Sequence, residues 1–232
     1  MEKPFEPKLA GESLLTTKLW ITRTAPDASR SAQAWKAAGF DPLIAPLIEI
    51  SAVENSESIP DKAELIFTSA NGVRHCGVRG DDRRVYAVGE ATAETARLQG
   101  FSNVVFGDKD WKRLSEIIEK TENSILHISG SIVRGRLVET LRERGFNASR
   151  RVVYRTSPVK KWPIDVETVQ AVALYSPLAA EALMSLPMRD LSSLTAYCLS
   201  PNVAAPLSSL DVRIASQPNE MSLIACSQAQ DG

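Results

Sequence analysis

The stretch S-R-R-V-V-Y-R-T-S-P, residues 149–158, decides how this chain is organised. Val152, Tyr154 and Thr156 share one face of it at a period of two, which is typical of a strand with an exposed face rather than of a buried parallel strand. Pro158 ends the strand, because a proline cannot donate to a ladder of hydrogen bonds. The stretch therefore predicts an exposed extended segment that leaves one globular unit and enters another.

A second extended stretch, P-L-I-A-P-L-I-E-I-S-A-V at residues 42–53, is interrupted by Pro46. Such an interruption suits an edge strand or a two-stranded ribbon. If the two stretches pair, one carries the chain out of a first lobe and the other brings it back. We then expect a cleft between two lobes, with Tyr154 close to it.

Elsewhere, from residue 18 onward, short apolar runs alternate with turns and amphipathic helices, which is the pattern of an α/β protein with parallel sheets. We predict two parallel-sheet α/β domains joined by a two-stranded β ladder. A single continuous sheet is the alternative topology. We expect a disordered extension at residues 1–17, a discontinuous first domain at 18–39 plus 161–232, the connecting ladder at 40–53 and 149–160, and an inserted domain at 54–148.

Composition narrows the class of protein. A hydrophobic content of 44% over 232 residues supports an ordinary buried core. A net charge of −1, from 27 basic and 28 acidic side chains, indicates no partner among nucleic acids or membrane surfaces. The 3 cysteines are widely spaced and form no C-x-x-C pair, which favours a reducing cytoplasm over a disulfide framework or a zinc site. No apolar run is long enough to span a bilayer.

Small polar clusters follow five of the predicted strands. In parallel α/β sheets, ligands bind at the carboxyl ends of the strands, where helix N-termini offer unpaired N–H groups to anions. Five such ends in one cleft would make a carboxylate receptor with few basic side chains; the alternative is that these residues are ordinary helix caps. The clusters are T-S-A-N-G at 68–72, G-E-A-T-A at 89–93, S-G-S at 129–131, S-P at 176–177 and S-P-N at 200–202.

Basic side chains and histidines add few candidates. Arg23 and Arg134 each stand where a guanidinium would bind a carboxylate, although both are also explained as surface arginines. The run G-S-I-V-R-G-R at 130–136 lacks the lysine of a phosphate loop, so nucleotide binding is weakly supported. His127 lies inside an apolar strand and is better explained as structural, and with His75 it is too few for a metal site. We therefore expect no metal and no cofactor.

Tyr154 is the side chain that we nominate for proton chemistry. Its phenol is a hydrogen-bond donor and a weak acid near neutral pH. The competing interpretation is a cross-strand aromatic that stabilises the ribbon.

Several of these motifs together resemble those of the uroporphyrinogen-III synthase family, in the same order and at similar spacing. They are L-I-F-T-S-A-N-G-V at 65–73, V-Y-A-V-G-E-A-T-A at 85–93, I-L-H-I-S-G-S-I-V-R-G-R-L at 125–137, V-V-Y-R-T at 152–156, A-L-Y-S-P at 173–177 and the segment 200–204. The resemblance implies the family's fold, in which a two-stranded ladder joins two α/β lobes around an open cleft. It covers nearly everything from residue 19 to the end.

The resemblance also implies a reaction, the closure of hydroxymethylbilane to uroporphyrinogen III with loss of water and inversion of ring D. Departure of the ring A hydroxyl gives an azafulvene, which ring D attacks to form a spiro intermediate. Because the bilane also cyclises unaided to the isomer without inversion, the protein mainly controls geometry. We expect a cytoplasmic monomer with this small-molecule substrate, and a non-catalytic two-lobed binder of a small polyanion is the alternative.

Residues that fall on matching motif positions are implied to bind the substrate, and Tyr154 matches the ladder tyrosine that assists departure of the hydroxyl. The chain departs from the family at residues 200–204, where S-P-N-V-A replaces the usual G-P-T-T-A and Asn202 replaces a threonine. Including the two arginines above, the expected substrate-binding residues are Arg23, Thr68, Ser69, Gly89, Thr92, Gly130, Arg134, Ser176 and Asn202.

Overall fold

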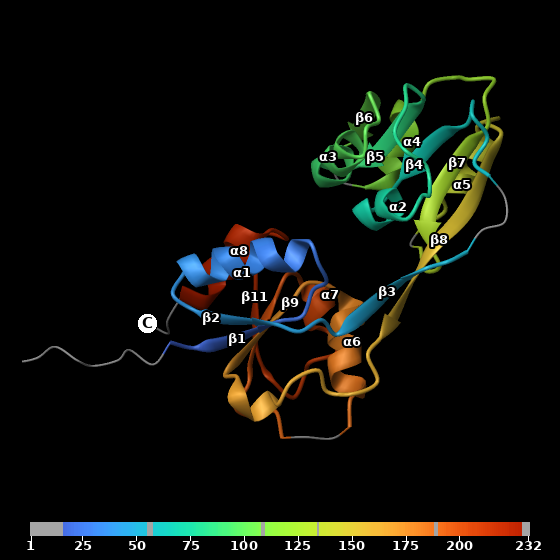
Figure 1. Cartoon of the computed structure of the whole chain (residues 1–232). Helices are drawn as coiled ribbons and strands as arrows, with labels where there is room; N and C mark the ends of the chain where they lie inside the picture. The colour runs from blue at the N-terminus through green and yellow to red at the C-terminus, as the bar shows by residue number, and fades with distance from the viewer. Residues whose placement is uncertain (1–15, 55–57, 108–109, 134, 188–189, 229–232) are drawn as a thin grey trace, which may run out of the picture. The chain divides into compact units, whose positions relative to one another are not determined.

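The structure is a computed structural model that divides into two compact units, residues 1–49 with 158–232 and residues 50–157 (Figure 1). It describes residues 16–54, 58–107, 110–133, 135–187 and 190–228. Most of the expected extension at 1–17 therefore lies outside the described residues. Among the helices described, none has the length and apolar character needed to cross a membrane.

The first unit contains a five-stranded sheet in the order β11-β10-β9-β1-β2, and every pair in it is parallel. The central strand β9 is buried at all four positions, because helices cover both faces of the sheet. The strands are β1 Lys18–Ile21, β2 Asp41–Ile44, β9 Ala171–Leu174, β10 Thr195–Cys198 and β11 Asp211–Ile214.

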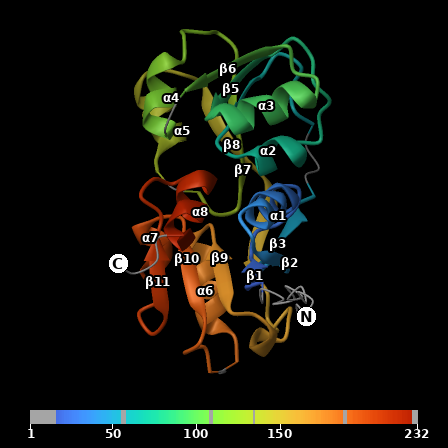
Figure 2. The ribbon, with the colours of Figure 1, turned by 90° about the vertical axis from the view of Figure 1, so that its left-hand side faces the viewer.

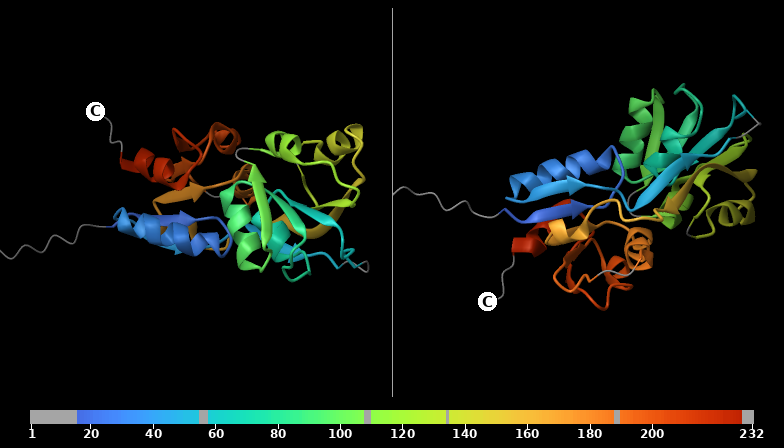
Figure 3. Two further views of the ribbon diagram at one scale, coloured as in Figure 1. Left: turned by 90° about the horizontal axis from the view of Figure 1, so that it is seen from above. Right: turned by 60° about the horizontal axis from the view of Figure 1, so that its bottom comes forward.

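Helices pack on both faces of this sheet, as the views in Figures 1, 2 and 3 show. Side chains alternate along β1, so Leu19 and Ile21 pack with Trp35 on one face, and Trp20 packs with the opposite layer. The first layer contains α1 Asp27–Ala37 and α8 Glu220–Gln228, and the second contains α6 Pro177–Ser185 and α7 Pro201–Ala204, with a short 3-10 helix at Val166–Thr168.

The second unit is built on a six-stranded sheet in the order β3-β8-β7-β4-β5-β6. Its pairs from β8 to β6 are parallel, and helices cover both faces, with Phe67 and Phe101 packed on one side and Ile66 and Leu114 on the other. The strands are β3 Ile48–Ala52, β4 Glu64–Phe67, β5 Arg84–Val88, β6 Asn103–Gly107, β7 Ile125–Gly130 and β8 Ala148–Pro158. The helices are α2 Ala70–Arg74, α3 Glu90–Leu98, α4 Trp111–Ile117 and α5 Leu137–Glu143.

The expected ribbon is present as β3 and β8, the two strands in which the chain crosses from one unit to the other. Val53 N donates to Val153 O at 2.9 Å and Val159 N donates to Leu47 O at 3.0 Å, so the two strands run antiparallel. There are two sheets, not one continuous sheet. The prediction of parallel α/β sheets with a two-stranded connection is confirmed.

The first half of the stretch expected to form the ribbon behaves differently. Residues 41–44 form β2, an edge strand parallel to β1, instead of part of the connecting ladder. Beyond the end of β2, Ala45 N donates to Ile21 O of β1, and Leu47 N donates to Thr22 O just after β1. Pro46, between these two donors, has no N–H to donate. Pro46 therefore separates two strands that belong to different sheets.

The period-two alternation in β8 is interrupted directly before Tyr154. The register of β8 against β7 pairs Ser129 with Val152 but Gly130 with Tyr154, so Val153 is an extra residue in a β-bulge. As a result Val153 and Tyr154 are both buried, with exposures of 2% and 9%. The strict period of two expected for residues 152–156 therefore fails at Val153, because a bulge re-aims the side chains that follow it.

Candidate active site

A pocket of about 340 Å³ lies within the second unit at the carboxyl ends of β4, β5 and β7. We call it the strand-end pocket, and its position agrees with the rule that ligands of parallel α/β sheets bind at this edge. It brings together four residues of the predicted site, Thr68, Ser69, Gly130 and Tyr154. The remaining lining residues are Val88, Asp110, Trp111, Ile132 and Val133.

Tyr154 is held in place by two neighbours. A Cβ atom at Gly130 would lie 2.6 Å from Cε2 and Cζ of the Tyr154 ring, so the ring rests directly on the glycine backbone. The ring of His75 lies 5.7 Å from the Tyr154 ring, centroid to centroid, and His75 Nδ1 is 2.9 Å from Asn71 O. The bulge, the glycine and this aromatic neighbour together fix where the phenol points.

Thr68 and His127 form a hydrogen-bonded pair beside the pocket, with Oγ1 and Nε2 at 3.0 Å. The His127 ring is only 4% exposed. Burial, and then the positive charge of Arg150, lowers the pKa of His127 from its usual 6.5 to about 4. At neutral pH the ring is therefore uncharged, and it fixes the orientation of the Thr68 hydroxyl at the mouth of the pocket.

The titration of His127 predicts a loss of stability in mild acid. Because its folded-state pKa lies below 6.5, protonation favours the unfolded chain, so the stabilisation is complete above about pH 6.5 and is lost as the pH falls toward 4. Between pH 7.5 and pH 5 this group should cost about 2 kcal/mol of the free energy of unfolding. Urea unfolding at both pH values should show this difference for the natural chain and a difference smaller by that amount for His127→Gln. His75→Gln is the matched control, and an identical pH response in the natural chain and His127→Gln would contradict the prediction.

The other predicted residues of the second unit have structural roles as well. Ser69 is the N-cap of α2, and its Oγ accepts a hydrogen bond from Asn71 N at 3.2 Å. Gly89 precedes α3 with φ of +73°, a conformation that favours glycine. Thr92 is buried inside α3. At this strand end the strand-end pocket is lined by Val88, and neither Gly89 nor Thr92 is among its lining residues. Arg134 lies outside the described residues.

The predicted residues of the first unit lie at the strand ends of that unit's own sheet. Ser176 is the N-cap of α6, accepting from Ala179 N at 3.2 Å, and Asn202 is an exposed residue of α7. Arg23 contacts two carboxylates, Asp27 at 3.4 Å and Glu220 at 3.3 Å. The guanidinium of Arg23 is thus already ion-paired within its own unit.

Arg23 belongs to a larger polar cluster that the sequence did not reveal. Its guanidinium lies 4.5 Å from the centroid of the Tyr175 ring, and the Tyr175 hydroxyl donates to Glu220 Oε1 at 2.9 Å. Burial, and next the charge of Glu220, raises the pKa of Tyr175 above its ordinary value. Glu220 also accepts a hydrogen bond from Ser31 Oγ at 2.9 Å. This cluster ties the N-terminal end of α8 to α1 and the strand ends.

Sequence reasoning also missed residues of the strand-end pocket. Asp110 and Trp111 follow β6, and Asp110 Oδ1 accepts hydrogen bonds from Lys112 N and Arg113 N as the N-cap of α4. The polar run G-D-K-D at 107–110 was a signal of the same kind as the five clusters after other strands. His75 carried no such signal, because it lies at the end of α2 and contacts Tyr154 only through the tertiary fold.

The fold and the pocket define the class of protein: a two-sheet α/β protein with a candidate site at strand ends, lined by a tyrosine from the connecting strand. A family model described as uroporphyrinogen-III synthase HemD matches residues 29–226. The chain therefore belongs to the uroporphyrinogen-III synthase family, which is a family of lyases of heme biosynthesis.

Solved structures agree on the fold. Uroporphyrinogen-III synthetase from Helicobacter pylori is 18% identical, with a TM-score of 0.65, over 93% of this chain and 99% of that one. A mutant uroporphyrinogen III synthase from the extremely thermophilic bacterium Thermus thermophilus is 17% identical, with a TM-score of 0.52, over 93% of this chain and 100% of that one. No curated protein sequence matches the chain.

Proposed function

We propose that this chain closes hydroxymethylbilane to uroporphyrinogen III, with loss of water and inversion of ring D, and that the strand-end pocket is where the reactive end of the bilane binds. Membership of the family supports the reaction. The observation that carries the site is the meeting of Tyr154 with Thr68, Ser69 and Gly130 in one pocket.

In this proposal Tyr154 acts as a hydrogen-bond donor to the hydroxyl that leaves ring A. A leaving hydroxide needs a proton or a strong hydrogen bond, and a neutral phenol supplies one without any charged group having to be buried. The bulge in β8 and the contact with Gly130 hold the phenol at the pocket wall. The azafulvene that forms is then attacked by ring D, and the protein contributes mainly by holding the two ends in the geometry of that attack.

Substrate carboxylates are bound mainly by hydroxyl and N–H groups. Thr68 offers a hydroxyl whose orientation is set by His127, and Ser69 lies next to it. In the first unit we assign this role to Ser176 and Asn202 at the carboxyl ends of β9 and β10. Arg23 would have to exchange Asp27 or Glu220 for a substrate carboxylate, so we assign it to holding α8 in place.

We place the protein in the cytoplasm as a monomer. The three cysteines are free thiols, and Cys76 and Cys198 are buried, which is the usual state in a reducing compartment. Light scattering at micromolar concentration checks the monomeric state.

The test is an isomer analysis. Freshly made hydroxymethylbilane is incubated with the protein, the products are oxidised to porphyrins, and the type I and type III isomers are separated by chromatography. We expect the type III isomer to dominate, while a control without protein yields the type I isomer by spontaneous closure. Accumulation of type I alone in the presence of folded protein would reject catalysis in favour of the non-catalytic binder.

A further inference from the structure

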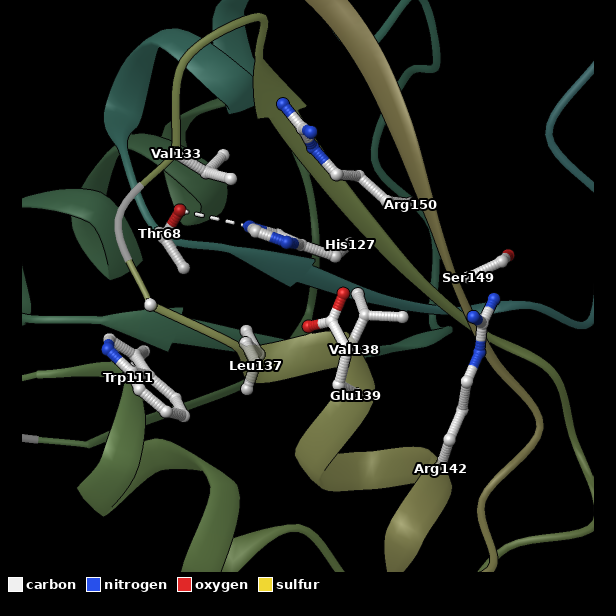
Figure 4. A pocket seen from close by; sticks show the side chains of 11 residues that line it. Thr68, Trp111, His127, Val133, Leu137, Val138, Glu139, Arg142, Ser149 and Arg150 are labelled. Atoms are coloured by element: carbon white, nitrogen blue, oxygen red, sulfur yellow. Dashed lines mark hydrogen bonds between the residues drawn. The ribbon is translucent and has the colours of Figure 1, made fainter.

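A second cavity, of about 320 Å³, adjoins the strand-end pocket in the same unit (Figure 4). We call it the His127 cavity. Thr68, Trp111 and Val133 line both spaces, so a ligand in one is in contact with the walls of the other. The other lining residues come from β7, α5, β8 and the segment before α5: His127, Gly135, Leu137, Val138, Glu139, Arg142, Ser149 and Arg150.

His127 brings a ring nitrogen to the wall of this cavity. His127 Nε2 is hydrogen-bonded to Thr68 Oγ1. Among the residues that the structure describes, His127 Nδ1 has no hydrogen-bond partner. The ring is 96% buried, since its exposure is 4%, yet it lines the cavity. The proposed reaction does not use this nitrogen. Among the described residues, the fully buried side-chain polar atom without a partner is Glu64 Oε2 and not His127 Nδ1, so His127 Nδ1 is open to the cavity and can accept a hydrogen bond from a ligand there.

Charge and shape give the class of ligand. Arg142 Nε donates a hydrogen bond to Ala148 O at 2.6 Å. The two terminal nitrogens of Arg142 have no partner among the described residues. Arg150 is fixed by Ser129 Oγ at 2.8 Å and by the carbonyl oxygens of Gly130 and Ser131. With Glu139 as the acidic group, the cavity carries one excess positive charge and suits an anion.

The walls of the cavity favour a flat ring. Figure 4 shows Trp111 and Leu137 on one side and Arg142 with Ser149 on the other, with His127 and Glu139 between them. A volume of about 320 Å³ is at the small end of ligand pockets, so it takes one ring of a tetrapyrrole and not the whole molecule. An aromatic wall opposite the Arg142 guanidinium, with Arg150 above His127, fits a ring that bears carboxylate side chains.

We propose that the His127 cavity binds a single pyrrole ring of the substrate, together with its carboxylate side chains. The pyrrole N–H donates to His127 Nδ1, while Nε2–H donates to Thr68; the ring face packs on Trp111, and the carboxylates bind Arg142 and Arg150. The inference rests on the proposed function, which it deepens by assigning one ring of the bilane. Because the two spaces share walls, the neighbouring ring then lies in the strand-end pocket beside Tyr154.

The probe that tests this is a monopyrrole with one carboxymethyl and one carboxyethyl substituent. The chain has 2 histidines, and His75 does not line the cavity, so ¹⁵N-histidine side-chain spectra contain their own control. We expect titration with the monopyrrole to shift the ring signals of His127 and to leave those of His75 in place. Absence of any His127 shift at millimolar probe, or equal shifts of both histidines, would overturn the proposal.

Matched probes and variants separate the contacts. The dimethyl ester of the same pyrrole removes the carboxylates, and the N-methyl derivative removes the N–H donor. We expect each change, and the variant Arg142→Gln, to weaken binding at least tenfold, as for a lost charge-assisted or buried hydrogen bond. Arg136→Gln, an exposed arginine beside the same helix that pairs with Glu143, is the control and should bind as the natural chain does. Equal affinity of acid and ester would refute the assignment of carboxylate binding to the arginines.

The isomer analysis distinguishes this inference from the proposed function. If the monopyrrole binds at His127 but no type III isomer forms, the proposed function fails and the site remains a pyrrole-acid site. If type III forms but His127 does not respond to the probe, the proposed function stands and the cavity is not a ring site. Arg142→Gln should raise the bilane KM more than it lowers kcat, because it removes binding that is made equally in the ground and transition states.

Discussion

Tyr154→Phe should lower kcat for uroporphyrinogen III formation by about 100-fold, the lower end of the range for a lost proton donor, since a phenol is a weak acid. The substitution removes one oxygen and leaves the ring that packs on Gly130. The free energy of unfolding should therefore change by less than about 1 kcal/mol. Single-turnover kinetics with fresh hydroxymethylbilane measure the rate, and urea unfolding measures the stability.

Tyr197→Phe is the control for this experiment. Tyr197 is 8% exposed, close to the 9% of Tyr154, but belongs to an aromatic cluster under the first sheet. It should keep the natural turnover. An unchanged rate in Tyr154→Phe would return that residue to the role of a cross-strand aromatic in the ribbon.

Gly130→Ala should lower turnover as much as Tyr154→Phe, although it removes no functional group. The new Cβ would meet two ring atoms of Tyr154 at 2.6 Å, closer than packed atoms allow. Since Tyr154 is held by the bulge and by His75, its ring must move away from the pocket wall or the strand must shift. Such overpacking costs about 1–3 kcal/mol of stability, and the larger effect is the misplaced phenol.

Gly145→Ala provides a matched comparison in the same unit. Gly145 has φ of +88°, and a Cβ there would meet nothing within 4 Å, so the substitution introduces backbone strain alone. It should cost about 1–2 kcal/mol of stability and leave turnover unchanged.

The double variant Gly130→Ala with Tyr154→Phe tests whether the glycine acts through the tyrosine. If it does, adding the alanine to Tyr154→Phe should lower kcat little further, because the donor is already absent. Full additivity of the two losses would show that Gly130 contributes in another way.

Much of the fold could be read from local pattern. Strand β4 was visible from the apolar run Leu65, Ile66 and Phe67, because positions covered on both faces of a sheet are mostly apolar; the buried Glu64 begins the strand. Thr68 and Ser69 were placed at a strand end for the same reason, and the pocket contains both. Local pattern failed at residues 41–44, which were expected in the connecting ladder. They pair with β1 in the first sheet, and local sequence does not say which neighbouring strand a segment pairs with.

Much less of the site could be read in this way. Tyr154 was found by its position on the connecting strand, but the bulge that turns it depends on the register with Ser129 and Gly130, which come much earlier in the chain. Trp111 and Arg142 reach the two spaces from two different helices, and His75, at the end of a third, contacts the Tyr154 ring. Nothing in the local sequence marks His75 or Arg142, because such contacts are made between side chains that are distant in the chain.

The sequence by itself determined the parallel α/β pattern, the polar strand ends and the connecting strand that carries Tyr154, because alternation of apolar and polar residues is a local property. The tertiary structure alone decided which way the phenol points, that Arg23 is ion-paired to Asp27 and Glu220, and that His127 keeps one nitrogen toward a cavity. Those outcomes depend on close approach between residues far apart in the chain, and distance in space is set by packing rather than by order along the backbone.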